Sequence, residues 1–554
     1  MDLLPHKMRR DGRAFLLLLP PLAFMLLFFF YPLLRILAQG VSGAAVTTLL
    51  RRPYFWQTAG FTLGQALLST LLTLLCGLPL AYLLARWEFP GRRLLRAVAT
   101  VPFVMPTVVV AAAFEALLGP AGPLNRLLQS AAGAAEPPLQ LQQTLTIILL
   151  AHIYYNIAIV VRLVGGFWAN LNPNLADAAR LLGAGRLRAF LTITLPLLRP
   201  ALVGAALLTF LFTFTSFGVI LILGGPAFRT LETEIYRQYV VFLRPDVAAT
   251  LSLLQILFTF LLMSAYSRWQ QRSGVPLDLR PRRIARQAPR GSSGRAILLV
   301  VTAGAFLLLA APLLALVARS FLAADGGWTL ANYQALSVSR AGRTAFVPPL
   351  RAVANSVGFA SLTMLLAGGL GLATATALHR AGGARRWLDA LFMLPLGASA
   401  VTLGFGYLIG FTWLRTSPLL VLIAHTLVAL PFVVRSLLPV LQGIRPVLRE
   451  AAAVHGANPR RVWREIDLPL VGRALLVGLI FAFTVSMGEF GATSFIARPN
   501  SGFLTLPIAI ERFLGLPGAV NFGQALALSA ILMGVCAAGF IGIERFRYAE
   551  IGEF

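Results

Sequence analysis

Continuous apolar stretches of about twenty or more residues recur along the whole chain. Each is long enough to cross a hydrocarbon core of about 30 Å as a helix. The stretches do not alternate apolar and polar residues, which is the pattern of barrel strands, so a β-barrel is excluded. Only 12% of the 554 residues are charged and 58% are hydrophobic. The sequence therefore predicts an all-α membrane protein.

Charged residues, proline and glycine divide the apolar stretches into two sets of six. The predicted spans of the first half are 15–38, 58–85, 95–118, 145–167, 200–223 and 247–268. Those of the second half are 296–318, 353–378, 388–412, 418–441, 470–496 and 521–543. About twelve membrane helices are expected.

The chain is strongly basic, with a formal net charge of +27. Its arginines lie in short runs between the apolar stretches, which is the distribution of a protein that keeps positive loops on the cytoplasmic side. Lipid is therefore the expected surrounding, and nucleic acid is not an expected partner. The two cysteines, Cys76 and Cys536, both lie inside apolar stretches and indicate neither a disulfide framework nor a thiolate metal site.

A polar segment rich in arginine, proline, glycine and serine separates the two sets of spans. We expect a first transmembrane domain at 1–269, a cytoplasmic linker at 270–295 and a second transmembrane domain at 296–554. The basic ends of the chain place both termini in the cytoplasm, which requires an even number of crossings in each half. The first apolar run is too long for a signal peptide and is expected to be a membrane helix.

The two halves share an internal repeat at a constant offset of 273 positions. His152 matches His425 and Arg162 matches Arg435, and the same register extends to Phe217-Gly218 and Phe490-Gly491. The halves are therefore parallel six-helix repeats. Upstream of this register, the offset between matching residues grows by about twenty positions. The first half therefore has extra length, which we assign to an external loop at 119–144. Composition gives that loop no function.

The most specific repeated feature is the loop between the fourth and fifth spans. It begins Asp177-Ala-Ala in the first half and Glu450-Ala-Ala in the second, continues to Gly-Ala, and ends in Ile-x-Leu-Pro. An acid complements the N-terminal dipole of a short helix, the alanines favour the helix, and the glycine ends it. Such a helix–turn–helix is too short to bury its own apolar face, so it must dock on the membrane surface or on another protein.

The doubled loop resembles the EAA motif of type I ABC importer permeases, whose short coupling helix sits in a groove of the ATPase subunit. The resemblance implies coupling to the ATPase at ten positions: Asp177, Ala178, Ala179, Gly183, Ala184, Glu450, Ala451, Ala452, Gly456 and Ala457. Asp177 departs from the family pattern by replacing Glu. The alternative is that both loops are amphipathic connectors held at the membrane surface.

The chain carries no site for ATP. The nucleotide-binding P-loop needs a lysine within G-x-x-x-x-G-K-[ST], and Lys7 is the only lysine of the sequence. ATP and Mg²⁺ are therefore expected in two separate ABC ATPase subunits, and the chain itself is expected to be a transport subunit with no cofactor and no enzymatic activity. The family resemblance also implies an extracytoplasmic solute-binding protein.

The fused two-in-one arrangement resembles the permeases of thiamine and ferric-iron importers, on the bacterial inner membrane. Segments within each predicted fifth span carry this likeness, from Phe214 to Gly218 and from Met487 to Gly491. The resemblance leaves the imported solute open.

Glu489 lies in the core of a predicted span, with Ser216 as its repeat mate. Burying a carboxylate in a membrane is costly, so these two positions are predicted to line a translocation path. The alternative is that Glu489 caps its helix or pairs with a neighbour such as Arg498. The repeated histidines, His152 and His425, are interpreted as packed or hydrogen-bonding groups rather than ligands.

The main rival class is a twelve-span secondary transporter of the major facilitator type, which also has two parallel six-helix repeats. Such proteins need coupling acids near the membrane midplane, whereas the cores of the predicted spans are apolar apart from Glu489. The loop from Arg86 to Arg93 also lacks the G-x-x-x-D-R pattern of that family. A membrane enzyme is disfavoured because no paired carboxylates or nucleophile–base set is apparent.

Overall fold

The fold comes from a computed structural model. It describes residues 6–40, 43–172, 174–272, 288–289, 291–323, 326–337, 348–381, 385–497 and 502–547. Every element within these residues is a helix. Most of the predicted linker at 270–295 and the predicted partner Arg498 lie outside the described residues.

Eleven helices in the described part of the chain are long and apolar enough to cross a membrane. A twelfth span is formed if Arg385–Gly397 and Ala400–Gly410, which meet at an angle of 94°, are taken together. All twelve overlap the spans predicted from the apolar stretches. The prediction of an all-α membrane protein with about twelve spans is confirmed.

The chain packs into two compact units that cut across the expected linear division. One consists of Met1–Leu49, Ile235–Leu253 and Ala323–Phe554, and the other of Leu50–Glu234 and Leu254–Leu322. The first span of each half thus packs in the unit built mainly from the other half. The predicted domain boundaries at 269 and 296 concern the sequence repeats, and they stay a prediction. The compact units differ from the repeats because the helices pack through their apolar faces and not in the order of the chain.

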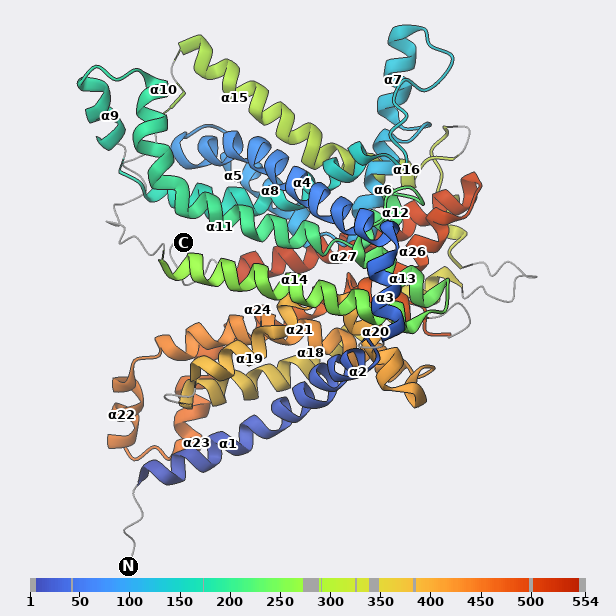
Figure 1. The fold of residues 1–554 in the computed structure, drawn as a ribbon. Helices are drawn as coiled ribbons and strands as arrows, with labels where there is room; N and C mark the ends of the chain where they lie inside the picture. Colours follow the sequence, from blue (N-terminus) through green and yellow to red (C-terminus); the bar gives the residue numbers. More distant parts are fainter. Residues whose placement is uncertain are drawn as a thin grey trace, which may run out of the picture. The chain divides into compact units, whose positions relative to one another are not determined.

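In the unit Leu50–Glu234 and Leu254–Leu322, three long helices pack side by side: α4 (Pro53–Arg86), α8 (Leu145–Asn170) and α11 (Leu195–Phe214) (Figure 1). Helix α16 (Ala311–Ser320), from the first span of the second half, packs on α6 (Thr107–Leu118). These contacts explain why the early residues of the second repeat belong to this unit.

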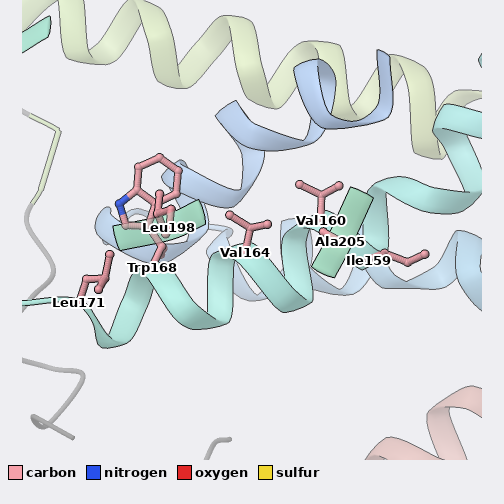
Figure 2. Packing of buried hydrophobic residues seen from close by; sticks show 8 residues of the cluster. Ile159, Val160, Val164, Trp168, Leu171, Leu198 and Ala205 are labelled. Carbon is pink, nitrogen blue, oxygen red and sulfur yellow. The ribbon is translucent and has the colours of Figure 1, made fainter. Parts of the chain in front are cut away.

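Buried side chains of α4, α8 and α11 form an apolar cluster, which Figure 2 shows from close by. The cluster consists of Ala85, Ile159, Val160, Val164, Trp168, Leu171, Leu198 and Ala205. Residues 160, 164, 168 and 171 recur at helical spacing, so one face of α8 is covered along its last three turns. The cluster therefore fixes the end of α8 from which the first repeated loop departs.

The other unit repeats this arrangement with α18 (Pro349–Arg380), α21 (Pro418–Gly443) and α24 (Leu468–Met487). Helix α27 (Ala519–Arg547) packs on α24, and α1 (His6–Met25) packs on α18. Figure 1 shows α18, α21 and α24 running together in yellow and orange.

The two repeats also share a close contact between helices, which a buried glycine makes possible in each. A Cβ on Gly77 would lie 2.8 Å from Cβ of Val160, and one on Gly371 would lie 2.8 Å from Cβ of Val433. The valines differ by 273 positions and the glycines by 294. The glycine offset agrees with the longer upstream offset expected from the sequence. In both units a glycine lets the second and fourth spans of a repeat approach closely.

Four predicted spans are interrupted where continuous helices were expected. The span 95–118 divides at Met105-Pro106, where α6 begins, and the span 388–412 divides at Ala398-Ser399. The spans 200–223 and 470–496 each divide into a long and a short helix. The short helices are α12 (Gly218–Leu223) and α25 (Gly491–Ile496). The hydropathy of the sequence does not reveal these breaks. An interrupted backbone is tolerated within a membrane protein where polar groups inside the protein satisfy it.

The extra loop at 119–144 contains a helix, α7 (Pro123–Ala132). The Asn125 side chain donates to the Leu139 carbonyl at 2.9 Å and accepts from the Leu139 amide at 2.8 Å. This amide pairing ties the return segment of the loop to α7. The loop is therefore an ordered element.

Candidate functional site

The doubled loop has the same construction in both halves. In the first it contains α9 (Asn174–Leu181) and the single turn α10 (Arg186–Ala189). In the second it contains α22 (Pro446–Val454) and the single turn α23 (Pro459–Val462). After each single turn a π-helical turn leads without a break into the fifth span, α11 or α24. A displacement of either loop would therefore act directly on a membrane helix.

The glycine of each loop ends its short helix in a Schellman motif. Gly183 has φ +89°, and Gly456 has φ +79°. The Ala184 amide donates to the Ala179 carbonyl at 3.0 Å, and the Ala457 amide donates to the Ala452 carbonyl at 3.0 Å. The glycine amides donate to the carbonyls three residues before them. The Gly-Ala pair of the motif is thus explained by the left-handed backbone that this cap requires.

The predicted coupling positions show the same pattern of exposure in both loops. In each loop the acid, the first alanine and the glycine are exposed, whereas the second alanine and the alanine after the glycine are partly buried. The structure thus presents Asp177, Ala178 and Gly183 to the outside, and likewise Glu450, Ala451 and Gly456.

Large apolar side chains flank these positions without cover from the described part of the chain. Leu181 is 89% exposed, Leu182 is 90% exposed, and Val454 is 85% exposed. Leu187 and Val447 are also exposed. Each loop therefore carries apolar surface next to its acid, which is the composition of a docking face.

The two loops are anchored to their membrane helices by different contacts. Beyond the first loop, the ring of Phe190 stacks on Trp168, with the centroids 6.1 Å apart. In the second, Arg449 of α22 pairs with Asp467 at 2.8 Å, and their side chains are 28% and 10% exposed. The Arg449 guanidinium also lies 3.3 Å from Nε2 of His379, at the end of α18.

We expect Asp467→Asn to lower the thermal stability of the protein, because it leaves the partly buried Arg449 without its countercharge. The loss should be about 1–2 kcal/mol, between the values for exposed and fully buried pairs. Asp177→Asn is the matched control, since Asp177 and Arg180 lie 3.3 Å apart with both side chains about half exposed. Melting of both variants in detergent checks this. Equal melting temperatures for the two variants would contradict a structural role for the Asp467 pair.

A buried histidine lies beside each break of the fifth span. In the first half, His152 of α8 shares hydrogen bonds with the hydroxyls of Ser69 and Ser216, each 2.9 Å long. Ser69 belongs to α4, and Ser216 lies between α11 and α12. The histidine therefore links the second, fourth and fifth spans at the point where the fifth span is interrupted.

In the second half, His425 of α21 occupies the same position beside the break between α24 and α25. Its ring shares hydrogen bonds with Ser486 at 2.7 Å and with Thr493 at 2.8 Å. Ser486 also donates to Thr363 of α18 at 3.4 Å. The second, fourth and fifth spans are therefore linked in this half as well, through more hydroxyl groups than in the first half.

Glu489 lies in this second node and is buried, with 7% exposure. Its carboxylate accepts from the amides of Ala492 at 2.8 Å and Thr493 at 3.0 Å, and from the Thr493 hydroxyl. His425 Nε2 lies 3.3 Å from the same carboxylate. The carboxylate thus satisfies the first amides of α25, as an N-terminal cap does.

The predicted path residues, Ser216 and Glu489, both occupy the interruption of a fifth span, each beside its repeat's histidine. Their role in a translocation path stays a prediction, and the hydrogen bonds of Glu489 correspond to the alternative of a helix cap. Sequence reasoning did not identify Ser69, Ser486 or Thr493. The pairing of His152 with His425 could have pointed to them, since a repeated histidine in an apolar helix needs polar partners.

The described residues contain no group of three or more His, Cys, Asp or Glu side chains that could hold a metal ion.

Comparison with known proteins finds the family described as "Binding-protein-dependent transport system inner membrane component". Its model matches residues 77–274 and again 367–546. Each match contains one copy of the doubled loop and one of the two buried histidines, His152 or His425.

Three relatives share similar levels of identity with the chain. The thiamine transport system permease protein ThiP of Brucella abortus is 28% identical over 512 residues, which cover 89% of this chain and 88% of that protein. The probable ABC transporter permease protein y4fN of Sinorhizobium fredii is 27% identical, covering 92% of this chain and 91% of its own. The putative 2-aminoethylphosphonate transport system permease protein PhnU of Salmonella typhimurium is 28% identical over 48% of this chain and 94% of its own length.

Among solved structures, a bacterial ABC transporter involved in the import of the acidic polysaccharide alginate is 20% identical to the chain. The match covers 48% of this chain and 98% of that one, with a TM-score of 0.42.

Proposed function

The chain belongs to the family of binding-protein-dependent transport system inner membrane components, and from this premise we propose that it is the complete transmembrane part of an ATP-driven importer. It is a multi-pass inner-membrane transport component with two copies of the family domain. In the proposed complex each copy supplies half of the translocation path, and both termini lie in the cytoplasm.

The observation that carries this proposal is the doubled loop. Two capped helices with the same exposure pattern each present an acid beside uncovered apolar side chains such as Leu182 and Val454. A pair of ABC ATPase subunits, which would bind ATP and Mg²⁺, is the proposed occupant of these faces. The sequence itself has no P-loop lysine, so the nucleotide sites belong to the partner.

The proposed coupling follows the continuous helix from each loop into the membrane. ATP-driven closure of the ATPases would move α9 and α22, and the π-helical turns would pass this movement to α11 and α24. The far ends of α11 and α24 are held beside His152 and His425. These polar nodes are the proposed fixed points about which the two halves alternate between inward and outward access.

The proposed cargo is a small solute of the thiamine or ferric-iron class, delivered by an extracytoplasmic binding protein. The similarity to the Brucella thiamine permease over 89% of the chain supports thiamine, whereas the similarity to a putative 2-aminoethylphosphonate permease shows that related domains have other assigned solutes.

Reconstitution tests the proposed function against its main rival. We expect uptake into proteoliposomes to require the ATPase, ATP and the binding protein together, and to continue when the proton gradient is collapsed. The matched control is the same liposome with a non-hydrolysable ATP analogue. Uptake by the chain alone, driven by a proton gradient without ATP, would instead identify a secondary transporter of the major facilitator type.

A further inference from the structure

Four aromatic rings meet in the unit that contains Ile235–Leu253 and Ala323–Phe554. Tyr236 packs edge-on against Phe495 with centroids 5.2 Å apart, and Tyr239 packs edge-on against Phe405 at the same distance. Tyr239 also lies 6.2 Å from Phe495. The tyrosines come from α13 (Leu231–Val240), and the phenylalanines come from α20 (Ala400–Gly410) and α25.

Two glycines fix the phenylalanines at the base of this aromatic cluster. A Cβ on Gly404 would lie 2.8 Å from Cα of Ala492, and one on Gly491 would lie 2.8 Å from Cβ of Ala400. The backbones of α20 and α25 therefore touch, and Phe405 and Phe495 are both fully buried. The two tyrosines above them are only partly buried, so the cluster has a closed base and an accessible side.

The charge of one carboxyl group, that of Glu511, acts on Tyr236. Glu511 of α26 (Leu506–Gly515) is partly buried, and burial raises the pKa of its carboxyl group although the Arg512 charge acts in the opposite direction. Burial, followed by the Glu511 charge, raises the pKa of Tyr236 to about 12. The Arg512 guanidinium reaches the Ala497 carbonyl at 3.5 Å, at the end of α25. A further cation would stabilise the ionised form of Glu511.

The aromatic rings are absent from the corresponding positions of the other repeat. The upstream offset of 294 places Ala111 at the position of Phe405, and the offset of 273 places Ile222 at the position of Phe495. The short helices that carry these positions, α6 and α12, pack on one another just as α20 and α25 do. Since the framework packs in both repeats and the rings occur in one, the rings are not needed to build the fold.

We propose that Tyr236, Tyr239 and Glu511, above the buried Phe495, form a binding site for the transported solute, and that this solute is an organic cation. This inference rests on the proposed importer function and selects within its solute classes. Aromatic faces attract cations whose charge is spread over carbon and nitrogen, and a nearby carboxylate adds to that attraction. A ferric ion instead requires a shell of several oxygen ligands, whereas this site supplies aromatic faces and a single carboxylate.

Uptake by the complete importer in proteoliposomes tests the site, with thiamine and choline as the probe cations. We expect Tyr239→Leu and Glu511→Gln each to raise KM for the transported cation about tenfold. Tyr239→Phe keeps the aromatic face and should stay within about twofold of the parent. Phe228→Leu is the control outside the cluster, where Phe228 packs on Phe61 with centroids 5.6 Å apart.

The outcomes separate this inference from the proposed function. Unchanged KM in both Tyr239→Leu and Glu511→Gln would overturn the site, as would ATP-driven uptake of ferric citrate or 2-aminoethylphosphonate with neither cation transported. Absence of any ATP-dependent uptake would overturn the proposed function. In that case equilibrium binding of the two cations to the full chain in nanodiscs still decides the site, and equal binding by the parent and Glu511→Gln would overturn it.

Discussion

Gly456→Val is expected to reduce solute-stimulated ATP hydrolysis and uptake by at least about tenfold, while the membrane-spanning part of the protein stays folded. Gly456 has φ +79°, and a Cβ there would meet no atom within 4 Å. The substitution therefore introduces no clash and acts only through the backbone. A left-handed conformation costs an ordinary residue about 1–2 kcal/mol, and a β-branched residue more. The loop would relax to another conformation and lose the Ala457 to Ala452 hydrogen bond.

Gly456→Asn is the matched variant, because asparagine tolerates the left-handed region. It should keep most of the activity, and Gly183→Val and Gly183→Asn should repeat the difference in the first loop. Gly472→Ala controls for adding a methyl group to α24, where the site is also open. The measurements are ATP hydrolysis by the assembled complex and co-purification of the ATPase. If Asn were as harmful as Val, the glycine would be required for contact with the partner and not for its backbone conformation.

Glu489→Leu is expected to abolish transport and to lower thermal stability. The substitution removes the acceptor for the amides of Ala492 and Thr493 and leaves these donors buried, at a cost of about 1–3 kcal/mol each. It also removes the carboxylate beside His425. Because the break between α24 and α25 depends on these bonds, the two helices should no longer hold their relative positions. Uptake, stimulated ATP hydrolysis and melting temperature should fall together.

Glu489→Gln distinguishes a cap from a residue of the translocation path. Its carbonyl oxygen can take the place of one carboxylate oxygen, but its NH2 group places donors opposite the amides of α25, so a cap predicts partial loss of stability, uptake and ATP hydrolysis in parallel. A path residue predicts lost uptake with stimulated ATP hydrolysis and melting unchanged. Ser216→Ala is the control at the repeat-related position, where one hydrogen bond to His152 is lost. Parent-like behaviour of Glu489→Gln in all three measurements would contradict both roles.

If two identical ATPases dock on the chain as proposed, the unequal nodes would make its response to them asymmetric. The second repeat adds a buried carboxylate to a histidine node that the first repeat forms with two serines. It also anchors its loop with the Arg449 pair, where the first uses aromatic stacking. Two partners of the same structure would therefore act on two loops that are held by different contacts.

The sequence by itself determined the class of the protein, the number of spans and the doubled loop. Membrane spans are predictable because the bilayer requires about twenty apolar residues in succession, whatever the helix packs against. The Gly-Ala pair of each loop is predictable for a similar reason. The Schellman cap at Gly183 or Gly456 is built from backbone groups within a few residues, so the local sequence contains all of it.

Only the tertiary structure decided which residues meet. The breaks beside Ser216 and Glu489 lie within spans that were predicted as continuous, and the histidines that contact these two residues, His152 and His425, come from another helix more than sixty positions away. The first span of each half belongs to the compact unit built mainly from the other half, and this arrangement also depends on contacts between distant segments. The same is true of the aromatic cluster around Phe495. Hydropathy measures the preference of each residue for lipid over water. It does not show which helix faces pack against one another.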